Sequence, residues 1–467
     1  MKKKYVLTLA CLCCMLLSQA QTLSKARELF NAGNYEEALP TFRKLVKQSP
    51  SNANYNYWYG VCCMETGADS IAGPYLTKAA SRKVLDAYPY LTRLQMNTYK
   101  FDDAVSTCED CIDLLTTRKK DTQEAEKLLE KARMGALMLR GTERVCVVDS
   151  FVVDKADFLS AYKTGPESGQ TTMPDDSTFY YENELGQKRY WALTQSGRTD
   201  IYTSDKLLDK WSTPKPVKGL DTDGNNNYPY LLADGTTLYY ANDGANSLGG
   251  YDIFVTRYNT DTDRYLKPEN LGMPYNSTAN DYLLVIDEFN NLGWFASDRQ
   301  QPEGKVCIYV FVPNPSRETF DFDTDGAETV TSRARLTSIR DTWTDETTLR
   351  KARERIAIAI QSRQQQTINH DFTFVIDDQH TYHSLTDFSS DKARTLFQQF
   401  KQMQQDFRKL SSQLDGLRDR YASSPDGQKQ QMTPQILDLE KRQEQMAMQL
   451  DELEIKARNT EKSHINR

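Results

Sequence analysis

The apolar positions of the C-terminal tail follow alternating steps of four and three residues, in two runs separated by a polar break at residues 423–427. Such heptad seams predict two long helices that pair along their apolar stripes. Thr433-Pro434 would start the second helix, since Pro is favoured at the first helical position. We therefore predict an antiparallel hairpin over residues 391–462. Because a heptad seam does not determine which helix pairs with it, a parallel dimer or a partner helix is the alternative. The seam positions are Leu396, Phe400, Met403, Phe407, Leu410, Leu414, Leu417 and Tyr421, then Ile436, Leu439, Gln443, Met446, Leu450, Leu453 and Ala457.

Between residues 22 and 140 the apolar pattern is helical and repeats. Ala38, Ala72 and Ala104 occupy equivalent positions 34 and 32 residues apart. This arrangement resembles the tetratricopeptide repeat, in which small residues stand where two helices cross closely. The resemblance implies an α-solenoid whose last helix, residues 122–139, acts as a cap. Its concave face would bind a peptide or a protein, and a simple spacer is the alternative.

From residue 145 to 315 the pattern changes to that of strands and turns. Three hairpin copies place an Ala at positions 192, 241 and 296, and the middle copy reads DGTTLYYA and then LGGYDIFV over residues 234–255. These segments resemble the TolB-like, WD-like β-propeller repeats of exported envelope proteins. Three copies are fewer than the roughly four to eight blades of most propellers. The resemblance therefore implies a fourth blade, with residues 145–153 as the first candidate strand, or an unusual closure. The third copy departs from the pattern at Cys307, where Asp is expected.

Two stretches next to these repeats are polar. Residues 163–178 are rich in Gly, Ser, Asp and Pro, which predicts an exposed loop. Residues 316–345 predict an irregular connection. A helix over 347–366 and a short hairpin from 372–376 and 380–383 would complete a mixed connecting segment, residues 316–390.

The first twenty residues have the pattern of a secretory signal peptide. A run of three Lys precedes a short apolar core and a small-residue site that predicts cleavage after Ala20. The apolar core is too short for a membrane span, and lipidation at Cys11 is the alternative. Processing would leave the mature chain at a formal charge of −10, against −7 for all 467 residues. This acidic balance argues against a dedicated nucleic-acid binder, which needs a basic face.

Six cysteines follow the signal segment, at positions 62, 63, 108, 111, 146 and 307. Their even number allows disulfides in an oxidising compartment, but sequence leaves the pairing open. Cys108 and Cys111 have the spacing of a redox or zinc motif. Because their flanks are helical and no second pair exists, buried helix packing is the favoured interpretation.

Catalytic signatures are absent from the sequence. It contains no Gly-x-Ser-x-Gly elbow, no phosphate-binding loop and no His-Glu-x-x-His helix. We therefore predict no catalytic residues and no cofactor.

Two groups of residues are candidate metal ligands. Asp321, Asp323 and Asp325 match the first half of a calcium loop, but Ser332 occupies the twelfth position, where a bidentate Glu is needed. An Asp/Gly turn is the favoured interpretation. His370, His380 and His383 cluster in sequence, yet strand positions three apart point to opposite faces. No metal site is predicted.

The predicted fold class is multidomain α + β: a tetratricopeptide α-solenoid, a TolB-like β-propeller and antiparallel coiled-coil helices. The combination resembles the repeat-plus-propeller subunits of Gram-negative envelope machines, including periplasmic accessory proteins of type IX secretion. Their OmpA-like C-terminal domain is missing here, so peptidoglycan attachment does not carry over.

The resemblance implies a non-enzymatic periplasmic scaffold at the outer membrane that binds envelope or secretion-complex proteins. Self-association through the C-terminal helices is the alternative that the heptad seams leave open. The alternative function is a propeller that binds a glycan or cell-wall fragment, with or without hydrolysis. In that case the aromatic residues between Tyr228 and Tyr251 would line its mouth, although packing between blades is the favoured role for them.

Overall fold

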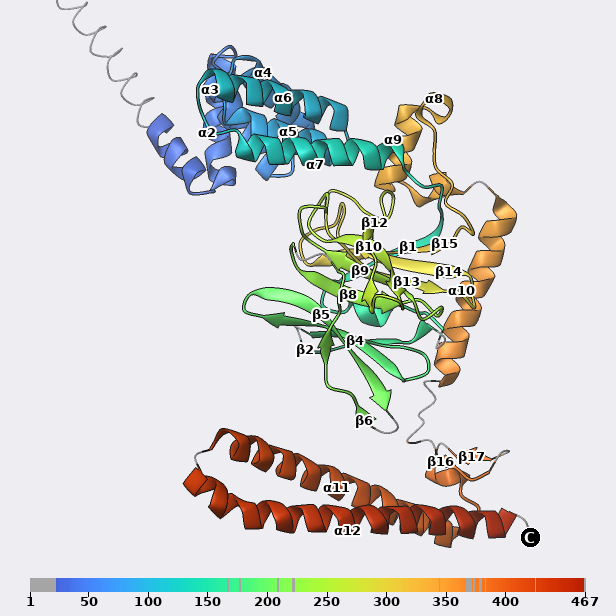
Figure 1. The fold of residues 1–467 in the computed structure, drawn as a ribbon. Coiled ribbons are helices and arrows are strands. Elements are labelled where there is room, and N and C mark those ends of the chain that lie inside the picture. The colour runs from blue at the N-terminus through green and yellow to red at the C-terminus, as the bar shows by residue number, and fades with distance from the viewer. Residues whose placement is uncertain are drawn as a thin grey trace, which may run out of the picture. The chain divides into compact units, whose positions relative to one another are not determined.

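The computed structural model divides the chain into two compact units, residues 1–360 and 361–467 (Figure 1). It describes residues 22–465 except 166–167, 176–177, 208–209, 221–222, 344, 367–371, 373, 378–379, 383 and 425. The predicted signal peptide, His370 and His383 therefore lie outside the described residues.

Antiparallel helices form the N-terminal part of the first unit. They comprise residues 22–31, α2 (Tyr35–Gln48), α3 (Ala53–Glu65), α4 (Asp69–Ser81), α5 (Ala87–Asn97), α6 (Phe101–Thr117) and α7 (Gln123–Arg140). The predicted small residues Ala38, Ala72 and Ala104 are fully buried. A Cβ on Gly60 would lie 2.8 Å from Leu76 Cγ, so helices α3 and α4 approach closely at this glycine.

Three antiparallel sheets follow in the first unit. The first contains β2 (Gln170–Asp175), β3 (Thr178–Glu182), β4 (Lys188–Gln195), β5 (Arg198–Leu207), β6 (Lys210–Trp211) and β7 (Lys215–Pro216). The second contains β8 (Asn226–Leu231), β9 (Thr237–Asn242), β10 (Asp252–Asn259), β11 (Arg264–Tyr265) and β12 (Glu269–Asn270). The third contains β13 (Asp281–Asp287), β14 (Leu292–Ser297), β15 (Lys305–Val312) and β1 (Cys146–Asp154).

Strand β1 lies in the third sheet, which corrects the prediction of a fourth blade that begins at residues 145–153. The segment expected to begin a fourth blade instead pairs with β15 as the fourth strand of the third sheet, with Val152 opposite Cys307. Because β1 pairs with β15 along most of its length, it covers the outer strand of the third hairpin copy. The segment 163–178 is also not a simple loop, since residues 170–175 form β2 and pair with β3.

The second and third sheets share a hydrogen-bonding device that repeats every 55 residues. Asn225 Nδ2 donates to Asp243 at 2.8 Å, and Asn280 Nδ2 donates to Asp298 at 2.9 Å. The Asn225 side-chain oxygen accepts from Thr199 N at 2.9 Å, and that of Asn280 accepts from Tyr251 N at 3.1 Å. Each asparagine thus ties its sheet to the preceding one.

Aromatic side chains fill the region where the three sheets meet. The Tyr228 ring lies 5.5 to 6.0 Å from those of Phe158, Phe179, Tyr251 and Tyr282. Phe158 comes from the short helix η1 (Phe158–Ala161). Tyr228 and Tyr251 therefore pack against other rings, as the favoured interpretation of these aromatics has it.

The connection after the sheets is more regular than its polar sequence indicates. It forms α8 (Phe322–Asp325), α9 (Ala327–Arg335), η3 (Ile339–Thr342) and α10 (Glu346–Gln366). Val330 and Ala334 of α9 are fully buried in one cluster with Ala132 and Ala136 of α7. The prediction of an irregular segment is wrong here, because tertiary burial stabilises a short helix that local pattern does not reveal.

The second unit is a helical hairpin with a small strand pair at its base. It contains β16 (Phe374–Val375), β17 (Thr381–Tyr382), η4 (Leu385–Asp387), α11 (Asp391–Ser423) and α12 (Asp426–Ile465). Gln443 Nε2 donates to Ser411 Oγ at 2.8 Å, and Arg418 pairs with Glu440 at 2.7 Å, so α11 and α12 run antiparallel.

Helix α12 begins earlier than predicted. It starts at Asp426, and Pro434 lies inside it. The Gln and Lys residues of 428–431 are good helix formers that extend the helix upstream of the proline. The predicted start at Thr433-Pro434 is therefore wrong.

Candidate functional site

A row of aromatic rings crosses the first helices of successive helix pairs. The rings of Phe30 and Tyr57 lie 5.7 Å apart, and those of Tyr57 and Tyr90 lie 6.0 Å apart. Arg93 stands over the Tyr90 ring at 4.7 Å and pairs with Glu65 at 3.2 Å. We call these five residues the aromatic row. It connects the helix over 22–31 with α3 and α5.

The aromatic row combines buried rings with accessible charge. Tyr57 is buried, and burial raises the pKa of its hydroxyl, so it stays protonated at neutral pH. The Arg93 side chain is 49% exposed, and that of Glu65 is 30% exposed. Next to the row, the exposed Arg27 stands over the Trp58 ring at 5.3 Å. Rings held in place beside exposed cations and a carboxylate suit recognition of a polypeptide.

The six cysteines of the described chain are all free. Cys108 and Cys111 are buried on helix α6, and burial raises the pKa of Cys111 to about 11. A redox or zinc-binding thiol needs the thiolate, which a raised pKa suppresses. The Cys-x-x-Cys spacing here places two thiols in a helix interface.

The predicted calcium-loop carboxylates have other partners. Asp321 Oδ1 accepts from Asp323 N and Thr324 N, both at 2.9 Å, and these bonds lower the pKa of Asp321. Asp325 pairs with Arg144 at 2.6 Å. Asp321 therefore serves as the N-cap of α8.

No set of three or more His, Cys, Asp and Glu residues could hold a metal ion within the part of the chain that the structure describes. Of the three clustered histidines only His380 is described, and its Nδ1 lies 2.8 Å from Asp377 Oδ1. The three Asp residues thus have hydrogen-bonding and ion-pair roles, whereas the histidine group lies only partly within the described residues.

A pocket of about 690 Å³ lies between the second and third sheets, and no sequence motif marks it. Glu143 lines it beside Tyr239, Tyr275 and Phe311. The buried Glu143 carboxylate accepts from Tyr275 Oη at 3.3 Å and from Asn314 Nδ2 at 3.2 Å, and burial raises its pKa. The volume is in the range of small-ligand sites. Its residues come from segments up to 174 positions apart, so no local motif could have revealed it.

Across the described residues, no helix combines the length and the hydropathy needed to cross a membrane.

Comparison with known proteins identifies the N-terminal helices. A family model described as tetratricopeptide repeat matches residues 23–90. The N-terminal region therefore contains tetratricopeptide repeats, as the 34-residue period predicts. No curated protein matches the chain.

Solved structures similar to the chain include two proteins with helical repeats. The TPR2B-domain:pHsp70 complex of yeast Sti1 is 15% identical to this chain, with a TM-score of 0.24. The match spans 25% of this chain and 97% of the Sti1 chain. The type III secretion translocator chaperone SycD of Yersinia enterocolitica is 17% identical to this chain, with a TM-score of 0.24. The match spans 25% of this chain and 85% of the SycD chain.

Proposed function

We propose that this protein is a non-enzymatic scaffold that binds other proteins through its tetratricopeptide repeats. The observation that carries the proposal is the aromatic row, in which Arg93 and Glu65 remain accessible beside rings fixed by packing. Stacked helix pairs with such a face are interaction modules. A partner polypeptide would pair with the exposed charges of Arg93 and Glu65, which the buried rings hold in position.

The proposed scaffold acts in the periplasm, at the outer membrane. The signal-peptide pattern of residues 1–20 and the resemblance to exported propeller proteins support this location. Residues 145–315 would form a propeller-like second interaction module, a role supported by three antiparallel sheets with a common core. Its partners would be envelope proteins or secretion-complex subunits.

Site-specific photocrosslinking tests the protein-binding role. A photoreactive amino acid replaces Arg27 or Arg93, and a matched control replaces Lys47, which is exposed on the second helix of the first pair. We expect one or more discrete protein adducts at the first two positions and none at Lys47. Equal labelling at all three positions, or no adduct at any, would overturn the role of the aromatic row.

Export is tested separately. The chain is produced with its full N-terminus in a Gram-negative host, and the protein in the periplasmic fraction is sequenced from its N-terminus. A mature protein that begins at Gln21 is expected. Cytoplasmic protein that keeps residues 1–20 would contradict the proposed location.

A further inference from the structure

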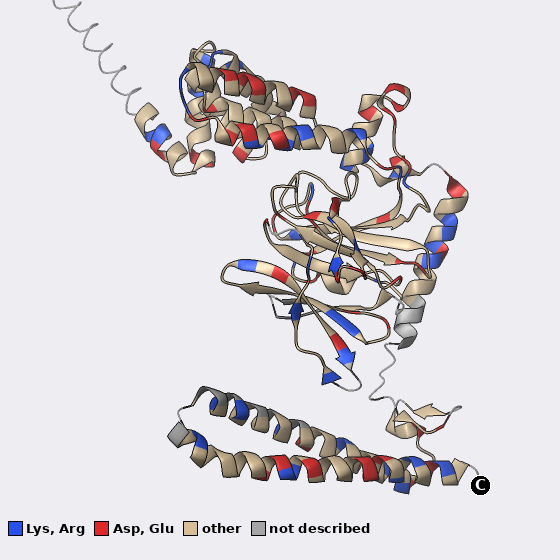
Figure 2. Cartoon of the chain, in the orientation of Figure 1, with Lys and Arg blue, Asp and Glu red and all other residues tan. Residues whose placement is uncertain are grey.

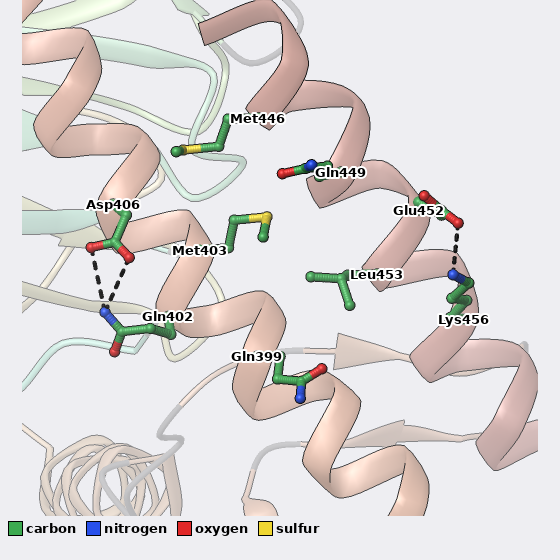
Figure 3. A pocket seen from close by; sticks show the side chains of 9 residues that line it. All are labelled: Gln399, Gln402, Met403, Asp406, Met446, Gln449, Glu452, Leu453 and Lys456. Atoms are coloured by element: carbon green, nitrogen blue, oxygen red, sulfur yellow. Dashed lines mark hydrogen bonds and ion pairs between the residues drawn. The ribbon is translucent and has the colours of Figure 1, made fainter. Parts of the chain in front are cut away.

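A trough of about 480 Å³ runs between α11 and α12 (Figure 3). Met403 of α11 and Met446 and Leu453 of α12 form its apolar floor. Its walls are polar and carry the amides of Gln402 and Gln449. An apolar floor between polar walls has the cross-section that receives one ridge of helix side chains.

The trough continues a seam that the hairpin alone does not cover. Among the described seam residues, Leu414, Leu417 and Ala457 are buried, whereas Met403, Met446 and Leu453 are only half-buried. Two helices can shield only the sides of their seams that face each other. Comparable seams in bundles of four helices are closed by a second helix pair.

The charges of the two helices indicate what covers this seam. Helix α11 carries seven Lys or Arg against four Asp, whereas α12 carries eight Asp or Glu against six Lys or Arg. Figure 2 shows these charges distributed along both helices. The net charges of +3 and −2 favour α11 beside α12 over two like helices side by side.

A second copy of the hairpin satisfies this rule. A two-fold axis parallel to the helices places α11 of the second copy against α12 of the first, antiparallel and at the same level as within one hairpin. The second copy's Gln402 then lies opposite the wall that carries Glu452 and Lys456. Its neutral side-chain amide would face these two residues, which already form an ion pair at 2.6 Å.

We propose that this trough is a dimer interface, in which two copies of the chain close a four-helix bundle through Met403, Met446 and Leu453. The methionines suit such a contact because their unbranched side chains adapt to a facing helix. The interface is independent of the aromatic row, so either proposal can fail without the other.

Sedimentation velocity of the full-length protein tests the proposal. The wild-type chain is expected at twice its 53.6 kDa mass at micromolar concentration. Met446→Lys places a charge in the trough and should weaken dimerisation at least tenfold. Gln445→Lys is the matched control, because it adds the same charge at the neighbouring exposed position and should leave the dimer intact. Far-UV circular dichroism checks that both variants keep their helices.

Any of three outcomes would overturn the dimer. A wild-type monomer at 100 µM would show that no second copy closes the trough. A Met446→Lys variant that keeps its helices and remains dimeric would place any dimer contact elsewhere. A wild-type monomer that becomes less compact on Met446→Lys would assign the trough to another part of the same chain.

Discussion

Arg299 donates to Asp281 at 2.7 Å, in a position where both side chains are almost completely buried. The other N–H groups of the Arg299 guanidinium donate to the carbonyl oxygens of Pro274 and Tyr275 and to Ser297 Oγ. Arg299 therefore ties β13, which contains Asp281, to the segment that leads into β13. Removal of one partner of such a buried ion pair destabilises the fold, because the remaining charge is neither paired nor solvated.

Arg299→Met is expected to destabilise the first unit by about 3 to 5 kcal/mol, since it leaves the Asp281 carboxylate buried without its partner. Urea unfolding followed by tryptophan fluorescence measures the loss. Lys218→Met is the matched control, because Lys218 pairs with Asp263 at 3.0 Å on the surface. Its loss should stay below about 1 kcal/mol. Similar losses of unfolding free energy in the two variants would show that the buried pair stabilises the fold no more than the surface pair.

Asp252 makes the stability of the first unit depend on pH. Its buried carboxylate accepts from Leu248 N and from Asn270 Nδ2, yet burial, reinforced by Asp281, raises its pKa to about 7. In the unfolded chain the acid ionises first, so its stabilising contribution is present below about pH 4 and is lost as the pH rises to about 7. We expect the free energy of unfolding to fall over this range by an amount on the order of 4 kcal/mol at most.

The measurement is urea unfolding of the wild type and Asp252→Asn at pH 5, 6, 7 and 8. The variant is less stable at pH 5, because its amide cannot accept all the bonds that the carboxyl group accepts. Its stability should change less between pH 5 and 7 than that of the wild type. Parallel pH profiles for the two proteins would contradict a raised pKa at Asp252.

The parts of the fold that sequence reveals are those with local periodicity. The helical repeats follow from Ala38, Ala72 and Ala104, whose 34- and 32-residue spacing is a direct consequence of close helix crossings. The hairpin of α11 and α12 follows from its seam residues in the same way. Each of these signals lies within one or two elements, so it does not depend on the rest of the chain.

The features that sequence does not reveal depend on long-range pairing. Val152 pairs with Cys307 across 155 positions, and neither segment alone indicates a partner. The Glu143 pocket and the Arg299–Asp281 pair also join distant segments. Helix α9 depends on burial of Val330 against α7. Patterns of local hydropathy carry no information about such contacts, which explains why the candidate ligand pocket was missed.

Gly250 is required by the contact between the second and third sheets. A Cβ at this position would lie 2.1 Å from the Asn280 side-chain oxygen, which accepts from Tyr251 N. Gly250→Ala should therefore displace Asn280 and destabilise the first unit by about 1 to 3 kcal/mol.

Gly416→Ala is the matched control for Gly250→Ala, because Gly416 lies within α11 and no atom lies within 4 Å of the Cβ it would gain. This variant should stabilise the second unit by about 1 kcal/mol through helix propensity alone. Thermal unfolding followed at separate probes of the two units gives both values. An unchanged first unit in Gly250→Ala would contradict the close approach at Asn280.

Glu461 anchors the base of the hairpin. Its fully buried carboxylate accepts from Tyr382 Oη at 2.9 Å, Ser389 N at 2.7 Å and Ser390 N at 3.1 Å. It therefore links α12 to β17 and to the two residues that precede α11. Glu461→Gln replaces one acceptor oxygen by a donor group that faces these donors, and we expect it to destabilise the second unit by about 2 kcal/mol.

A double-mutant cycle with Tyr382→Phe separates the anchoring role from simple packing, because this variant removes only the hydroxyl. If the hydrogen bond links the two residues, the combined loss is smaller than the sum of the single losses by about 1 kcal/mol. Amide hydrogen exchange of Ser389 and Ser390, just before α11, supplies a second readout, since their N–H groups lose their acceptor. Unchanged exchange there, together with additive losses, would show that Glu461 does not hold the base of the hairpin.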